Sequence, residues 1–222
     1  MAANVRMTQV PQGPEPSPRP TALDAPAQAY LARLAALHDE AAETAHLANL
    51  LGRAPWAASA LGVAALGTAL ASVAQVSSAP LAAWLGLLAI AVAAIARSYS
   101  KAIEAPFDRT TLKGFAKSLS AILIYAGGAW GAGIFLALPA QLGIPGSILF
   151  VAALSAILVG ILRARDLSHS FVASATAMGA FCALMRDANV AAAAGILASG
   201  LLIAGAAILL ERFSAPLPST QN

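Results

Sequence analysis

The chain has 222 residues, of which 59% are hydrophobic and only 10% are charged, far below the roughly 25% that is usual in soluble domains. Its net charge of +3 does not indicate nucleic-acid binding, because the basic residues flank apolar runs, where membrane orientation selects for them. Charged residues and histidine are absent from residues 54–96 and 118–162. Runs this long predict an all-α, polytopic membrane bundle, because backbone amides in hydrocarbon must pair within a helix and barrel strands span only about 10 residues.

The N-terminal part divides into two predicted segments. Residues 1–23 are rich in proline, which blocks helix formation, and they predict a disordered tail. Residues 24–53 predict one cytoplasmic amphipathic helix, because apolar side chains recur there at spacings of three, four and seven. These are Tyr30, Leu34, Leu37, Ala41, Ala48 and Leu51. The acidic centre of this helix disfavours anionic lipid, so we expect it to contact a protein.

Six transmembrane helices are predicted next, in a domain of residues 54–212. They are expected at about 56–75, 79–96, 118–138, 146–162, 169–185 and 190–210. At 1.5 Å per residue, the longer ones cover roughly 30 Å of hydrocarbon. The fifth is the least certain span, because serine, threonine and histidine make its first half polar. Residues 97–117 are predicted to form an internal loop with a short interfacial segment, and residues 213–222 a disordered tail.

Basic residues collect at one set of predicted span ends. They are Arg53, Arg97, Lys101, Arg109, Lys113, Lys117, Arg163, Arg165 and Arg212. The opposite set of ends has Arg186 alone. Since basic residues concentrate on the cytoplasmic side, both chain termini are predicted to be cytoplasmic.

The spans contain aromatic and small residues that are candidates for packing or for a pocket. Trp130 lies in a glycine-rich stretch with the GxxxG pair Gly127 and Gly131, close to Tyr125. We expect Trp130 to fill space above the small residues, with a pocket for a small ligand as the alternative. The GxxxG pair is expected to serve packing within the bundle first and homodimerisation second. Trp84 is expected at the outer membrane interface.

Catalytic and metal-binding patterns are weak in this chain. Asp39, Glu43 and His46 share one helical face, but a solvated polar face explains them equally well, so we expect no metal and no cofactor. Cys182 lies in an apolar run and predicts an inert buried thiol. No ionisable side chain is predicted mid-span, which argues against an ion-coupled transporter.

The order of these features resembles a known family. Asn49, Leu50 and Leu51 lead into the first span, the second carries Trp84 and closes on Arg97, and the third carries Ala129–Trp130–Gly131 and ends at Pro139. This order resembles the N-terminal multi-pass sensor module of the MASE type in bacterial diguanylate cyclases and histidine kinases. The resemblance implies membrane sensing in the bacterial inner membrane, coupled to a cytoplasmic output through dimerised helices.

The family's output domains have no counterpart in the printed sequence. No GGDEF-like loop or kinase segment follows Arg212, so we expect a stand-alone sensory or regulatory module and not an enzyme. Its expected partners are the lipid bilayer and either a second copy or another membrane or cytoplasmic protein. The alternatives are an accessory subunit of a larger membrane complex and a small-molecule transporter.

Overall fold

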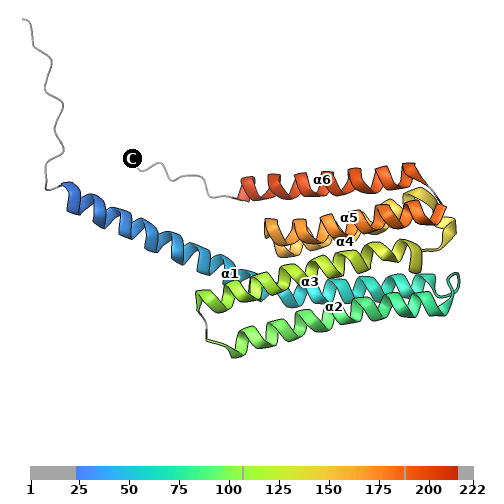
Figure 1. Ribbon diagram of the computed structural model, residues 1–222, viewed down its shortest axis with the longest axis horizontal. Coiled ribbons are helices and arrows are strands. Elements are labelled where there is room, and N and C mark those ends of the chain that lie inside the picture. Colours follow the sequence, from blue (N-terminus) through green and yellow to red (C-terminus); the bar gives the residue numbers. More distant parts are fainter. Residues whose placement is uncertain (1–23, 107, 188, 215–222) are drawn as a thin grey trace, which may run out of the picture. The chain divides into compact units, whose positions relative to one another are not determined.

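The structure, a computed structural model, describes residues 24–106, 108–187 and 189–214. Within these ranges the regular elements are all helical (Figure 1). They are α1 (Asp24–Ser72), α2 (Ser78–Glu104), α3 (Arg109–Leu136), the short 3₁₀ helix η1 (Ala140–Leu142), α4 (Gly143–Leu162), α5 (Arg165–Asp187) and α6 (Val190–Ser214). The predicted tails lie outside the described residues, except that α6 includes residues 213 and 214.

Each of the six α-helices contains a segment long and apolar enough to cross a membrane. The predicted all-helical class and the predicted number of apolar helices are therefore confirmed. The 27 residues of α2 correspond to about 40 Å of helix, more than the roughly 30 Å of a hydrocarbon core. The fifth span is also a full helix, since α5 has 23 residues.

The first helix differs from the prediction of a separate amphipathic helix that ends at residue 53. α1 is one helix of 49 residues, and Pro55 lies inside it. Proline lacks an N–H and disfavours a helix interior by about 3 kcal/mol. The buried side chains around it, Leu51, Ala54 and Ala57, pack against the bundle and offset that cost.

The predicted internal loop of residues 97–117 is also wrong. α2 continues to Glu104 and α3 begins at Arg109, so the connection is short. Both helix ends are amphipathic: Ala102 and Leu112 are buried, whereas Lys101 and Lys113 are exposed. A charged helix end that extends beyond an apolar run keeps its backbone hydrogen bonds, so the loss of hydropathy did not mark the helix boundary.

Asp108 caps the start of α3, and acid is expected to weaken this cap. Its Oδ1 accepts a hydrogen bond of 2.7 Å from the Thr111 N–H, and this bond lowers the pKa of the carboxyl group below its ordinary value of 3.8. The folded pKa is thus below the unfolded one, so the cap stabilises the fold above pH 3.8 and the effect is lost as pH falls through the folded pKa.

Unfolding of the purified protein, followed by circular dichroism at neutral and at acidic pH, tests this expectation. Asp108→Asn keeps a capping oxygen but does not titrate, so the variant should lose less stability on acidification than the native chain. Equal acid sensitivity of the two proteins would contradict the assigned role of Asp108.

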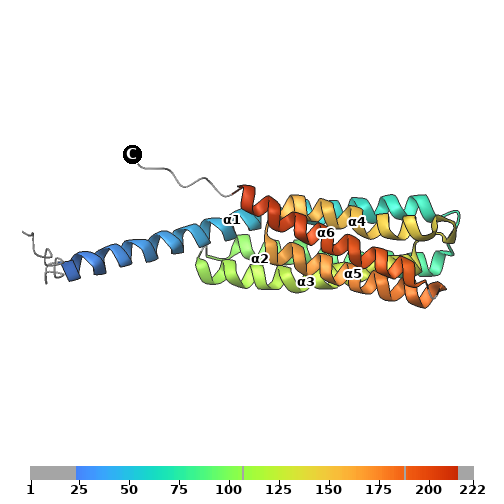
Figure 2. The ribbon, with the colours of Figure 1, turned by 90° about the horizontal axis from the view of Figure 1, so that it is seen from above.

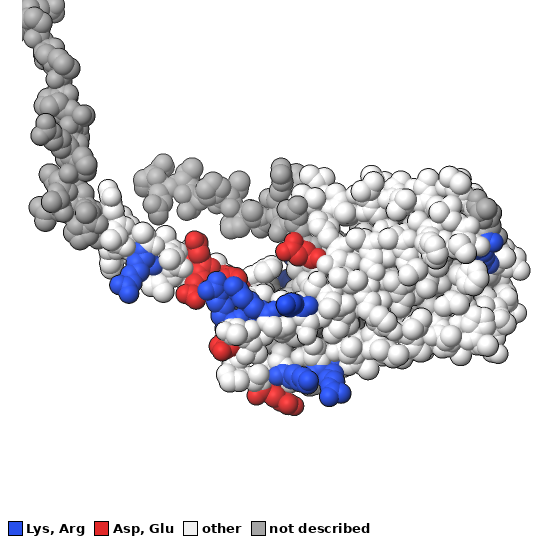
Figure 3. Space-filling view, in the orientation of Figure 1, with Lys and Arg blue, Asp and Glu red and all other residues white. Residues whose placement is uncertain are grey.

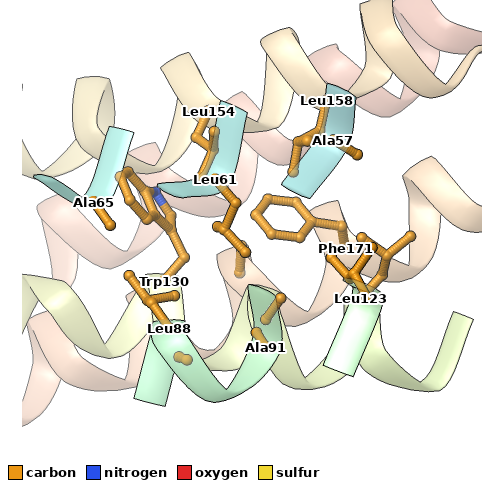
Figure 4. Close-up of a cluster of buried hydrophobic side chains, with 14 of the residues drawn as sticks. Ala57, Leu61, Ala65, Leu88, Ala91, Leu123, Trp130, Leu154, Leu158 and Phe171 are labelled. Carbon is orange, nitrogen blue, oxygen red and sulfur yellow. The ribbon is translucent and has the colours of Figure 1, made fainter. Parts of the chain in front are cut away.

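The described part of the chain divides into two units, residues 24–43 and residues 44–214. In the second unit, α3 packs against α2 and α5, α5 against α4 and α6, and α4 against α6. Figures 1 and 2 show these helices running alongside one another. α1 joins them through the shared core: Figure 4 shows Leu61 from α1, Trp130 from α3 and Phe171 from α5 converging. The guanidinium of Arg53 adds a 3.3 Å hydrogen bond to the Leu162 carbonyl of α4.

In the first unit, residues 24–43 are helical. Its large apolar side chains are exposed, with fractions of 64% for Tyr30, 44% for Leu34 and 58% for Leu37. These three residues lie on the apolar stripe predicted from the spacing. A helix of this length gains its stability mainly from packing of such a face, so the stripe is a surface suited to contact with another molecule.

Candidate functional site

Three aromatic side chains from three helices pack together around the tryptophan of the predicted pocket. Trp84 of α2, Trp130 of α3 and Phe150 of α4 lie with ring centroids 4.4 to 6.1 Å apart, and Trp130 stacks on Phe150 at an interplanar angle of 9°. The Trp130 indole N–H donates to the Phe150 carbonyl at 2.9 Å, and the Trp84 indole N–H donates to the Ala129 carbonyl at 2.9 Å. Both indoles therefore satisfy their polar group inside the bundle.

This geometry corrects the expected position of Trp84. An interfacial tryptophan keeps its polar edge near water, whereas Trp84 is 0% exposed and is held on α3. Room for it comes from Gly133, where a Cβ atom would lie 2.7 Å from both the Trp84 indole nitrogen and the Phe150 ring. Trp130 is 3% exposed and packs in the cluster.

The glycine pair of α3 lies against the backbone of α5. A Cβ at Gly127 would come within 2.5 Å of the Phe171 carbonyl oxygen, and one at Gly131 within 2.5 Å of the Ala175 carbonyl oxygen and 2.7 Å of the Gly179 nitrogen. The GxxxG face thus lets α3 and α5 approach closely, as small residues do between membrane helices. Tyr125 is not part of this contact face and is 40% exposed.

Hydroxyl groups add polar contacts to the α3–α5 interface. The Ser174 hydroxyl donates to the Ile124 carbonyl at 2.5 Å, and the Ser120 and Ser170 hydroxyls lie 3.2 Å apart. α5 also contacts α4 and α6, and its Ser168 and Thr176 side chains are buried. This position explains why α5 is less apolar than the other spans and is still a full-length helix.

A hollow of about 100 Å³ opens near the ends of α3 and α5 and the starts of α4 and α6. Its polar lining residues are Arg186, Asn189 and Ser147, and its apolar ones include Ile134, Ile144 and Ala183. Trp130 is not among the described residues that line it. No sequence pattern indicates this hollow beyond the isolated basic residue at position 186.

Arg186 is held in a defined place at this hollow. Its Nη1 donates to the Ile134 carbonyl near the C-terminal end of α3 at 2.6 Å, and to the carbonyl of Leu138, just after that helix, at 2.9 Å. Asn189 is equally ordered, because its Oδ1 accepts a 3.0 Å hydrogen bond from the Ala192 N–H and so caps α6. The polar groups of the hollow are therefore positioned by the helix ends themselves.

The remaining candidates from the sequence are the acidic and histidine side chains of α1 and the single cysteine. Within the described part of the chain, no three His, Cys, Asp or Glu side chains lie together as metal ligands would, and this includes Asp39, Glu43 and His46. Cys182 is a buried free thiol. In the polar first half of α5, the His169 Nε2 lies 3.3 Å from the Ala204 carbonyl oxygen of α6.

Comparison with protein-family models, with curated proteins and with solved structures finds no match for this chain. The resemblance to a MASE-type sensor module therefore stays a prediction based on the quoted residues. The function has to be inferred from the helices, the charges and the exposed surfaces.

Proposed function

We propose that the chain is a multi-pass protein of a bacterial inner membrane with its basic end in the cytoplasm. Six helices of suitable length and composition support the insertion. Figure 3 shows Lys and Arg side chains gathered at one end of the bundle, where α2 ends and α3 begins. Arg97, Lys101 and Arg109 are exposed there, and such a bias favours the cytoplasmic side.

Within that membrane the chain acts as a regulatory or sensory module through helix contacts. The observation that carries this proposal is the extent of α1: one helix includes the exposed apolar stripe around Leu34 and Leu37 and also the buried residues Leu50 and Leu61. A change in how the buried part of α1 packs is passed along the same helix to residues that contact a partner. The MASE-type resemblance points to the same kind of function.

Partner recovery from membranes of the native host tests this proposal. The deletion has to be confined to residues 24–43, because Leu50 and Leu51 belong to the bundle core. The tagged full-length chain, solubilised in mild detergent, should recover a protein partner, and the deletion variant should lose it. A stable isolated monomer from the full-length chain would contradict the proposal and also the alternative of an accessory subunit.

A matched pair of double variants sharpens the test. Leu34→Glu with Leu37→Glu places two charges on the apolar stripe, and we expect at least a tenfold loss of recovered partner, about the effect of 1.4 kcal/mol. Ala35→Glu with Ala42→Glu adds the same charge to exposed positions off the stripe and should leave recovery unchanged. Equal losses in both pairs would show that charge, and not the stripe, decides the contact.

A further inference from the structure

The apolar stripe of residues 24–43 follows the repeat of a coiled coil. Successive members of the stripe, Tyr30, Leu34, Leu37 and Ala41, are separated by four, three and four residues, which places them at alternating d and a positions of a heptad. All four side chains are exposed. A seam of a and d positions, with a period of 3.5 residues, is the pattern by which two helices supercoil around each other. The stripe is therefore suited to a second helix with the same repeat.

We propose that the second helix is the same segment of another copy of this chain, and that the two segments form a parallel, in-register coiled coil. The second copy is then the partner that contacts the stripe, and in this respect the proposal rests on the proposed function. Two copies inserted in one membrane have the same orientation, so their α1 helices leave it on the same side and with the same chain direction. Each seam residue then lies opposite its own counterpart across a two-fold axis.

The charges of the segment are compatible with this arrangement. Asp39 falls at an f position, on the side of the helix away from the seam. In a parallel dimer Arg33, at a g position, faces the e position of His38 on the other helix, and Glu40, at the next g position, faces Ala45. Within the described segment no two acidic side chains face each other across this dimer, so repulsion between carboxylates does not oppose it.

The small size of the seam favours a second copy over a helix from solution. Residues 24–43 correspond to about 30 Å of helix. A standard interface uses about 20–30 residues a side and buries roughly 800 Å² on each partner, whereas a seam built on four a and d residues engages far fewer. A soluble partner would lose its translational freedom for this small contact. A second copy is already confined to the same membrane, which raises its effective concentration at the stripe.

Disulfide formation in isolated membranes that contain the full chain tests the proposal. Cys182 is first replaced by alanine, because it is the native cysteine of the sequence. Ala41→Cys then places a thiol on the seam, and the matched control Ala32→Cys places one at an f position; both positions are exposed. A disulfide requires Cβ atoms about 3.5–4.5 Å apart, so on oxidation with copper phenanthroline we expect Ala41→Cys to form a disulfide-linked dimer at least about tenfold faster than Ala32→Cys.

A further variant and the partner experiment complete the test. Adding Leu34→Glu and Leu37→Glu to the Ala41→Cys chain removes the apolar contacts of the seam and should lower the rate to that of Ala32→Cys. Equal rates for Ala41→Cys and Ala32→Cys, or no disulfide from either, overturn the second copy as the partner. If the full-length chain then still recovers another protein, the regulatory function stands with a different partner. If it recovers none, both proposals fail.

Discussion

Replacing both Gly127 and Gly131 with alanine is expected to lower the free energy of unfolding by about 3 kcal/mol, the upper part of the usual range for overpacking. The new methyl groups would meet backbone atoms of α5 at 2.5 Å. A flexible side chain could turn away from such a contact, but a helix backbone has to move as a whole. We also expect the variant to keep most of its helix content although its free energy of unfolding falls, because the helices separate and do not melt. Reversible unfolding in mixed detergent micelles, followed by tryptophan fluorescence, measures the difference.

The chain provides a matched control for this variant. At Gly67 in α1 and Gly205 in α6, an added methyl group would have no atom within 4 Å. Alanine at both sites should leave stability unchanged or raise it, since alanine gains roughly 0.5–1 kcal/mol over glycine inside a helix. If the two double variants behave alike, α3 and α5 do not approach each other as closely as described.

The glycine pair also shows what the sequence could and could not predict. A GxxxG pattern in an apolar helix indicates close packing, and that expectation agrees with the contacts of α3. The identity of the opposing helix was not readable, because Phe171, Ala175 and Gly179 face α3 only in the register that the finished bundle sets. Periodicity identifies a face, and the partner of that face depends on topology.

Helix ends were predicted less well than helix number for a physical reason. Hydropathy marks where side chains leave an apolar environment, but backbone hydrogen bonding decides where a helix ends. α2 and α3 continue past the apolar runs at Arg97 and Lys117, where charged side chains point outward on an intact helix. α1 likewise continues through Pro55, because packing on both sides of the proline holds it.

The hollow beside Arg186 was beyond sequence prediction for a different reason. Its lining comes from α3, η1, α4, α5 and α6 and from the connections between them, and none of these segments alone has an unusual composition. An isolated arginine at a span end has an ordinary interpretation as a residue that reaches the interface. Its two hydrogen bonds, to a carbonyl near the end of α3 and to one just after it, become visible only when the helices are assembled.

Replacing Trp84 with alanine is expected to lower the free energy of unfolding by about 3 kcal/mol, the low end of the range for buried tryptophan. We expect the low end because separated helices in a micelle are still surrounded by hydrocarbon. The lost free energy therefore comes mainly from packing contacts and not from transfer of the side chain out of water. Trp84 is fully buried, contacts Trp130 and Phe150, and joins α2 to α3 through the Ala129 carbonyl. The same detergent titration, followed by circular dichroism because a fluorophore is lost, measures the effect.

Two further substitutions distinguish the causes of the stability loss. One tests the hydrogen bond of the indole apart from its size, and the other tests the loss of a tryptophan at an exposed position. Trp84→Phe removes the N–H but keeps an aromatic ring, so about 1 kcal/mol should be lost, the usual net value of one hydrogen bond. Trp56→Ala removes a side chain that is 70% exposed and should change the stability by less than about 0.5 kcal/mol. If Trp84→Ala were as mild as Trp56→Ala, position 84 would lie at an interface, as its place near the start of a span first indicated. If Trp84→Ala lowers the free energy of unfolding several times more than Trp56→Ala does, position 84 lies at the junction of α2, α3 and α4. There the aromatic cluster holds three helices in one register.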